Sequence, residues 1–205
     1  MIYEIDNNIR DKYRAEINLK YVTEKEDNYN IFGEEFVKNN KDNIELNING
    51  EKSSLINKCK LRKGENNIKM KIKNKIKHLQ YMFHECENLK NIDELEYLNT
   101  KYCNNFSYMF NRCSLLSDIK GLKKCNVLNC NNFERMFNGC SSLSDIKSLK
   151  EWNVLNCNNF HDMFRGCSSL SNVKGLEKWN LSKVNNFYGM LNGCSSLSNI
   201  EALEK

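Results

Sequence analysis

The 205-residue chain contains no proline and only nine glycines. Linkers and disordered segments are usually rich in these residues, so the composition marks no flexible boundary between domains. No hydrophobic run approaches the roughly 18 apolar residues that a membrane-spanning helix needs. Residues 1–10 carry early acidic groups and no apolar core of signal-peptide length. We therefore predict a globular protein without a membrane span or a secretion signal.

The chain also lacks the sequence motifs of enzyme active sites. It has no glycine-rich phosphate loop, no Gly-x-Ser-x-Gly and no His-Glu-x-x-His. Its three histidines, His78, His84 and His161, form no repeated pattern with carboxylates or cysteines. Catalysis requires positioned groups in an irregular pocket. We therefore predict that the protein is not an enzyme and has no cofactor and no metal site.

A pattern that returns every 27 residues organises the chain from residue 76 onward. Methionine and cysteine keep this spacing in every unit, at Met82, Met109, Met136, Met163 and Met190 and at Cys86, Cys113, Cys140, Cys167 and Cys194. A fixed period of this size is typical of a solenoid, in which each unit stacks on its neighbours. Residues 76–205 are therefore predicted to form about five units, the last one incomplete.

Each unit is predicted to contain one short helix and one short strand. Asn131 or Asn132 stands where a helix N-cap belongs, and Ile146 between polar neighbours indicates a strand. Gly139 is replaced by charged residues in earlier units, so we predict that this position does not require a left-handed glycine conformation. The predicted fold is an α/β repeat solenoid, a leucine-rich-repeat horseshoe with a short helix plus a short strand in each 27-residue coil. The helix is predicted from apolar residues spaced as on one helical face, which are Phe133, Met136, Phe137, Cys140 and Leu143.

Residues 1–75 lack the repeat and are predicted to form a small, mostly-β N-terminal capping region. Residues 15–22, 44–48 and 68–76 alternate polar and apolar, as half-buried strands do. Asn49-Gly50 is a hairpin turn signal, and residues 33–40 have the pattern of a short helix. The first unit of a solenoid needs a cover for its apolar end. Capping is therefore the predicted role, and an independent binding domain is the alternative.

The repeat motif resembles that of a known family. The run Met-Phe-x-Gly-Cys-Ser-Ser-Leu-Ser, followed by Leu-x-x-Trp-Asn-Val, is most complete at residues 136–143 and 152–154. It is similar to the BspA-like leucine-rich repeats of bacterial and protist surface proteins, and the likeness covers residues 76–205. Residues 31–43 also resemble the leader of protist members. The resemblance implies a binding or adhesion scaffold without enzyme activity. This chain departs from the family motif at Leu191, where the motif has Phe, and at Cys125, where it has Trp.

The ten cysteines allow three interpretations, which are buried reduced thiols, disulfides or a zinc site. In two repeat columns an apolar residue replaces cysteine, as Val184 and Trp152 do. A small buried hydrophobe can be exchanged in this way, whereas a zinc ligand cannot, so we favour buried thiols. Such thiols predict a reducing compartment, and we expect the protein in the cytoplasm. The family resemblance implies the cell surface as the alternative.

The outward positions on either side of the predicted strand are the candidate partner-binding residues. Solenoids commonly bind partners on their concave face. We therefore predict a scaffold that binds another protein through a concave strand face, with an ordinary solvated surface as the alternative. The candidates are Asp93, Asp118, Lys120, Asp145, Lys147, Asn172, Lys174, Asn199 and Glu201.

Two further hypotheses concern other surfaces. A structural or self-associating module would stack through an open C-terminal repeat that exposes Leu197, Ile200 and Leu203. The lysine-rich run at residues 58–77 would suit an anionic surface. Because the aromatic residues of a nucleic-acid reader are missing nearby, we expect no nucleic acid as a partner.

Overall fold

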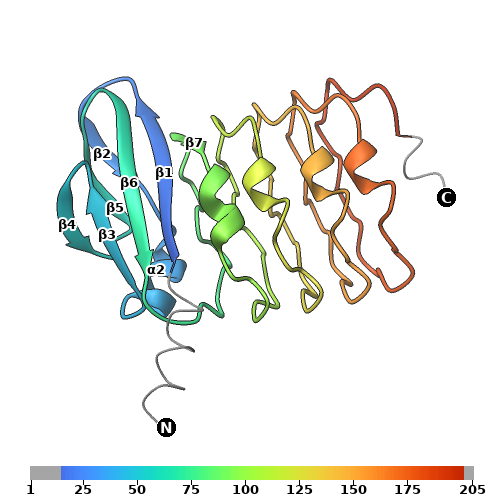
Figure 1. The fold of residues 1–205 in the computed structure, drawn as a ribbon. Coiled ribbons are helices and arrows are strands. Elements are labelled where there is room, and N and C mark those ends of the chain that lie inside the picture. The colour runs from blue at the N-terminus through green and yellow to red at the C-terminus, as the bar shows by residue number, and fades with distance from the viewer. Residues whose placement is uncertain (1–14, 201–205) are drawn as a thin grey trace, which may run out of the picture.

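The computed structural model describes residues 15–200, which are mostly β-sheet. An antiparallel sheet with the strand order β4-β3-β6-β1-β7 is accompanied by a two-stranded antiparallel sheet of β2 and β5. Figure 1 shows both sheets and the helix α2 at one end of the molecule. The bounds of these elements are β1 (Ala15–Thr23), β2 (Asp27–Asn30), α2 (Glu34–Asn40), β3 (Ile44–Ile48), β4 (Glu51–Ser54), β5 (Lys58–Leu61), β6 (Gly64–Ile72) and β7 (Leu89–Asn91).

The described part of the N-terminal region contains the strands β1 to β6 and the helix α2. In β6, the buried Met70 and Ile72 alternate with the exposed Lys71, as expected for a strand with one face on a core. Asn49 and Gly50 link β3 to β4 with positive φ at both residues, 51° and 102°. This is the backbone that a tight hairpin turn requires. The predicted short helix at residues 33–40 is α2.

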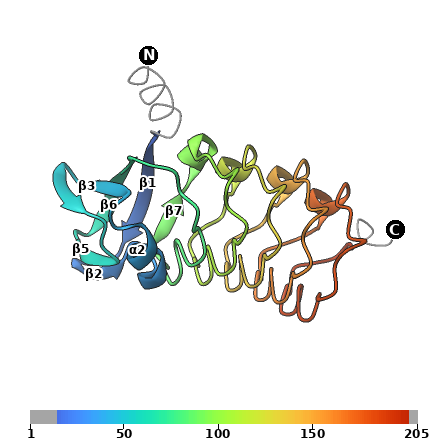
Figure 2. The same ribbon diagram turned by 90° about the horizontal axis from the view of Figure 1, so that it is seen from below.

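From β7 onward, the 27-residue units lie side by side in a row that extends away from the sheets (Figures 1 and 2). Backbone hydrogen bonds join neighbouring units, and one example is the amide of Phe137, which donates to the carbonyl of Met163 at 2.9 Å. Each of the first four units also contains a short 3-10 helix, and these helices line one side of the row (Figure 2). They are η1 (Asp93–Tyr97), η2 (Lys120–Leu122), η3 (Lys147–Leu149) and η4 (Lys174–Leu176).

The prediction of an α/β repeat solenoid with the shape of a leucine-rich-repeat horseshoe is wrong. Among residues 15–200, α2 is the one α-helix, and it lies outside the repeat. The described chain consists of two antiparallel sheets, this helix, short 3-10 helices and turns. No described repeat unit therefore contains the short α-helix on which the predicted fold depends.

Residues 133–143 form a series of hydrogen-bonded turns instead of the predicted helix. The amide of Met136 donates to the carbonyl of Phe133, three residues back, and Cys140 bonds in the same way. An α-helix would place these bonds four residues back. Arg135 and Gly139 also have positive φ, 51° and 75°, which a right-handed helix does not contain. Apolar residues spaced three and four apart therefore fit this turn series as well as a helical face.

Two local predictions within the unit also fail. The glycine column does adopt left-handed backbone, with φ of 75° at Gly139 and 63° at the equivalent Arg112. Ile146 is not the centre of a strand, because its φ of −121° and ψ of 17° lead directly into η3. The cause is local, since Asp145 Oδ1 accepts a hydrogen bond from the amide of Lys147 at 2.7 Å. An aspartate that bonds the amide two residues on favours a turn over an extended chain.

One apolar core runs from the sheets into the repeat units. Burial of the methionine column is confirmed, because Met109, Met136 and Met163 have no exposed surface. The ring of Phe137 stacks on that of Phe164, with centroids 5.5 Å apart and 4° between the planes. Stacked rings of this kind add to the burial of apolar area. The identical side chains of successive units thus hold neighbouring units together.

The cysteines belong to this core, as predicted. Of the ten cysteines, nine are buried and Cys59 is half-buried. The Sγ atom of Cys140 lies 3.1 Å from the carbonyl oxygen of Phe110, in the preceding unit. Burial raises the pKa of the Cys140 thiol to about 12. These residues therefore act as small buried hydrophobes, each with a weak S–H donor.

Candidate binding surface

The partner-binding residues predicted from the sequence lie at the starts of the 3-10 helices and not on strands. Residues that begin such a helix are Asp93, Lys120, Lys147 and Lys174. Residues two positions earlier are Asp118, Asp145 and Asn172. Asn199 forms a parallel bridge with Asn172, and Glu201 lies outside the described residues. The structure thus brings the described members into one row, but the strand face on which they were expected is absent there.

Local capping and ion pairing account for much of this row. The Asp118 Oδ1 atom accepts a hydrogen bond from the amide of Lys120 at 2.8 Å. The Lys120 Nζ atom lies 3.1 Å from Asp93 and 3.4 Å from Asp118. Lys147 pairs with Asp145 at 3.1 Å. Such exposed pairs contribute only about 0–1 kcal/mol each, so the row has a local structural role without a strong sign of function.

A second surface contains two adjacent repeat columns whose residues change from unit to unit. Both columns lie between the phenylalanine column and the invariant methionine column, which are buried in most units. The buried columns keep the same packing in successive repeat units, while the two columns between them carry a different pair of side chains in each unit. We name this surface the variable strip, and it consists of Gln80, Tyr81, Ser107, Tyr108, Glu134, Arg135, His161, Asp162, Tyr188 and Gly189.

The second column of the variable strip carries large side chains on left-handed backbone. The angle φ is 61° at Tyr81, 57° at Tyr108, 51° at Arg135, 53° at Asp162 and 65° at Gly189. Left-handed backbone costs a residue other than glycine about 1–2 kcal/mol, and glycine avoids this cost. Four of the five units nevertheless keep a large or charged side chain there. Backbone strain that persists in this way is typical of functional positions.

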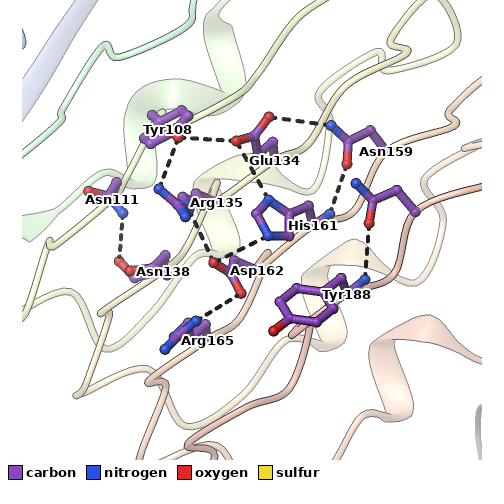
Figure 3. A network of polar contacts seen from close by, with 11 residues as sticks. Tyr108, Asn111, Glu134, Arg135, Asn138, Asn159, His161, Asp162, Arg165 and Tyr188 are labelled. Carbon is purple, nitrogen blue, oxygen red and sulfur yellow. Dashed lines mark hydrogen bonds and ion pairs between the residues drawn. The ribbon is translucent and has the colours of Figure 1, made fainter.

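A network of polar contacts joins three repeat units within the variable strip, as Figure 3 shows. The Arg135 Nε atom donates to Asp162 Oδ2 at 3.1 Å, and Arg135 Nη1 donates to the hydroxyl of Tyr108 at 3.2 Å. The Tyr108 hydroxyl in turn donates to Glu134 Oε1 at 3.1 Å. The His161 ring lies between the two carboxylates, 3.7 Å from Glu134 and 3.6 Å from Asp162. The side chains of the network are therefore held in fixed orientations.

Asp162 anchors this network from within the protein. Its side chain is only 1 % exposed, and it also receives Arg165 Nη1 at 3.5 Å. Gly189 of the next unit lies directly over the carboxylate, because a Cβ atom added there would stand 2.1 Å from Asp162 Oδ1. A carboxylate paired with two guanidinium groups makes strong, directional hydrogen bonds. Because Gly189 has no side chain, the Asp162 carboxylate has room to pair with Arg135.

Aromatic rings occupy both ends of the variable strip. Tyr81 and Tyr108 stack with centroids 4.8 Å apart and 15° between the planes. At the other end, the ring of Tyr188 is 75 % exposed and lies 5.6 Å from that of His161. Burial, followed by the hydrogen bond to Glu134, raises the pKa of Tyr108. This phenol therefore remains a protonated donor at neutral pH.

An asparagine two residues before four of the five positions of the first column sets the local geometry of the strip. Asn132 Oδ1 accepts from the amide of Glu134 at 2.8 Å, and Asn159 Oδ1 accepts from that of His161 at 3.0 Å. The sequence analysis placed a helix N-cap at Asn131 or Asn132, so it assigned these columns to a helix and missed the strip. The signal that could have found the strip is the variability of two columns enclosed by nearly constant ones.

Across residues 15–200, no helix has the length and apolarity to span a membrane. Within the same range, no group of three or more histidine, cysteine, aspartate or glutamate side chains is placed to hold a metal ion.

The fold and the surface together define a mostly-β repeat protein with an interlocked strip of tyrosine, arginine, histidine and carboxylate side chains. Residues 53–172, more than half of the chain, match the family described as "Mycoplasma protein of unknown function, DUF285". The chain belongs to this family. The matched segment begins in β4 and includes most of the variable strip. No curated protein and no solved structure matches the chain.

Proposed function

We propose that the chain is a non-enzymatic scaffold that binds another protein through the variable strip. The observation that carries this proposal is the retention of Tyr81, Tyr108 and Arg135 on left-handed backbone, in a column that changes from unit to unit. Tyrosine and arginine are enriched among the residues that dominate the energy of protein interfaces. A strained position filled by these residue types favours a role in recognition over a role in packing.

The charge balance of the strip favours a protein partner over a highly charged ligand. Arg135 and Arg165 are both paired with Asp162, so neither offers an unpaired charge to a polyanion. The stacked rings and bonded polar groups are already ordered, and binding them therefore costs little side-chain entropy. The resemblance of the repeat motif to BspA-like repeats supports the same class of function.

The test compares capture of a partner by the wild-type chain and by two triple variants. Protein from the organism that encodes the chain is passed over immobilised wild type, over Tyr81→Ser/Tyr108→Ser/Tyr188→Ser, and over Lys120→Glu/Lys147→Glu/Lys174→Glu. We expect the tyrosine variant to lose the partner that wild type retains, because it removes the rings of the variable strip. The lysine variant should keep the partner, because it alters only the row at the 3-10 helices.

If the lysine variant loses the partner and the tyrosine variant keeps it, the binding surface is instead the row of residues at the starts of the 3-10 helices. A partner that both variants retain would exclude both surfaces. Circular dichroism of each variant verifies that the sheets are intact before capture is compared. Light scattering over a range of concentrations separates binding of another protein from self-association, since a self-associating chain would grow in mass without any partner.

A further inference from the structure

The last repeat unit lies at the end of the row that is farthest from the sheets (Figure 1). In each of the three units before it, four backbone amides donate to carbonyls of the following unit. Within residues 158–184 these donors are Phe160, Asp162, Phe164 and Gly166, at 2.7 to 2.9 Å from their acceptors. The equivalent amides of the last unit have no acceptor among residues 15–200, and they belong to Phe187, Gly189, Leu191 and Gly193. We name the surface formed by these four residues the end face.

The apolar side chains of the end face are less covered than their equivalents in earlier units. Phe187 is 42 % exposed, whereas Phe160 is fully buried. The two rings stack with centroids 5.9 Å apart, so Phe160 covers one side of the Phe187 ring. Leu191 is only partly buried, although the equivalent Phe164 has no exposed surface. The end face therefore combines a line of amide donors with apolar surface that a following unit would cover.

The other end of the row shows how the protein satisfies such an edge. In later units, the carbonyls equivalent to those of His78 and Met82 accept from the preceding unit. In the first unit, the carbonyl of Met82 accepts from the amide of Gly33 at 3.0 Å. The carbonyl of His78 accepts from Asn40 Nδ2 at 3.1 Å. The N-terminal region thus takes the place of a preceding unit, and it does so with groups of the required hydrogen-bonding type.

The hydrogen-bonding pattern also decides what can cover the end face. Two copies that met end face to end face would set amide donors against amide donors, so these groups could not pair. The first unit of a second copy is covered by its own N-terminal region, through Gly33 and Asn40. An acceptor-bearing segment must therefore come from a different protein. Exposed backbone edges commonly bind partners by such strand addition.

We propose that the end face binds a repeat-like segment of another protein chain, which continues the row by one unit. Four carbonyls at alternate residues of this segment accept from the four amides of the end face. Within the row, the equivalent carbonyls belong to Asn159, His161, Met163 and Arg165. An apolar residue that directly follows the first carbonyl stacks on Phe187, as Phe160 stacks on Phe133 with centroids 5.6 Å apart.

The backbone of the segment is specified further by the row. Asp162 and Gly166, which lie among the residues that supply these carbonyls, have φ of 53° and 71°. A matching segment therefore places glycine, or another residue that tolerates left-handed backbone, three and seven residues after its first carbonyl. An ordinary extended strand lacks this backbone. The partner is thus recognised by the turn pattern of a repeat unit and by its apolar residues.

The test uses the full chain and a fluorescent synthetic peptide with the sequence of residues 131–157, kept reduced. We expect the amides of the end face to exchange hydrogen quickly in the free chain and about tenfold or more slowly with saturating peptide, measured by NMR on isotope-labelled chain. The amide of Phe164, which is already paired, is the internal control and should exchange slowly in both states. A peptide of the same composition in scrambled order should not bind.

Two variants locate the site by fluorescence anisotropy. Phe187→Glu/Leu191→Glu should weaken binding of the peptide by about tenfold or more, because it places charges on the end face. The matched control is Leu128→Glu/Leu155→Glu, which introduces the same charge at leucines that are 44 % and 37 % exposed elsewhere on the row. This control should retain the wild-type affinity. Phe187→Ser/Leu191→Ser repeats the comparison without new charge if the glutamate variant is not folded.

Several outcomes would overturn the proposal. Slow exchange of the end-face amides without peptide would mean that they are already paired. Absence of binding would also overturn it, as would equal binding of the scrambled peptide or an equal loss of affinity in the two double variants. Growth in mass with concentration of the chain alone, measured by light scattering and abolished by Phe187→Glu/Leu191→Glu, would assign the end face to self-association instead.

Discussion

Asp162 accepts a hydrogen bond at 3.1 Å from Arg135 of the preceding repeat unit, although the Asp162 side chain is only 1 % exposed. The ion pair spans two units, so it forms only when these units are stacked in register. Tyr108, one unit further back, accepts a hydrogen bond from the same arginine at 3.2 Å. The chemistry of the variable strip and the packing of the row therefore depend on each other.

Because Gly189 packs directly against Asp162, we expect Gly189→Ala to lower the free energy of unfolding strongly. The added Cβ would stand 2.1 Å from Asp162 Oδ1, on backbone with a φ of 65°. Gly166→Ala is the matched control, because φ there is 71° but the nearest atoms are 3.7 Å away. We expect about 1 kcal/mol of lost unfolding free energy for Gly166→Ala and about 2–3 kcal/mol for Gly189→Ala, measured by urea denaturation. Equal losses would show that Asp162 moves aside freely.

The buried carboxylate itself is predicted to stabilise the row. Asp162→Ala removes the acceptor of Arg135 and Arg165, whose side chains are 38 % and 48 % exposed. Because both guanidinium groups can return to water, we expect a loss of about 1–3 kcal/mol and not the larger cost of a fully buried unpaired charge. Asp118→Ala, at an exposed carboxylate, should cost less than about 1 kcal/mol. A loss for Asp162→Ala no greater than for Asp118→Ala would contradict the anchoring role.

The buried thiols predict a loss of stability at high pH. Burial raises the pKa of Cys140 from 9.0 to about 12, so between these values the unfolded thiol releases its proton and the folded thiol keeps it. Below pH 9 the protonation of Cys140 does not favour either state. The free energy of unfolding therefore falls as pH rises above 9, by about 1.4 kcal/mol per pH unit for one such thiol.

Cys140→Ala tests this contribution, because it removes the titrating thiol. Its unfolding free energy should fall less steeply with pH than that of wild type, by about 1.4 kcal/mol per pH unit above pH 9. Denaturant titrations over the alkaline range measure both slopes. Parallel slopes would mean that the Cys140 thiol ionises equally well in the folded protein.

The asparagine before the variable strip supports a turn through its side-chain oxygen. Asn132→Ala removes the acceptor that holds the amide of Glu134 at 2.8 Å, and we expect about 1 kcal/mol of lost stability. Asn132→Asp retains an oxygen at this place and should restore most of the loss. The two variants are compared by thermal denaturation, and equal destabilisation would exclude the hydrogen bond as the cause.

The sequence predicted the features that depend on local alternation and on burial. The strands of the N-terminal region, the Asn49-Gly50 hairpin and the buried Met136 column follow from polar–apolar patterns that allow few alternatives. The secondary structure of the repeat was mispredicted, because the spacing of Phe133, Met136 and Phe137 suits a turn series as well as a helix. The deciding bonds are not local, since the amide of Phe137 donates to Met163 in the next unit.

The candidate site was harder to predict for a related reason. Left-handed backbone at Tyr108 and Arg135 has no signature in residue type, because these residues rarely adopt it. The charged columns at Asp118 and Lys120 were conspicuous in the sequence, but the structure gives them local bonds. The family resemblance and the cytoplasmic location stay predictions, since the described residues bear on neither.

The central claim is that the tyrosine side chains of the strained column are kept for binding and not for stability. Tyr108→Gly tests it most directly, because glycine relieves left-handed strain of about 1–2 kcal/mol while the stacking and hydrogen bonds of Tyr108 are lost. Unfolding free energy and affinity for the captured partner are measured on the same preparation. The claim predicts a change in stability below about 1 kcal/mol together with an affinity at least about tenfold weaker. Unchanged affinity with a stability loss of several kcal/mol would contradict it.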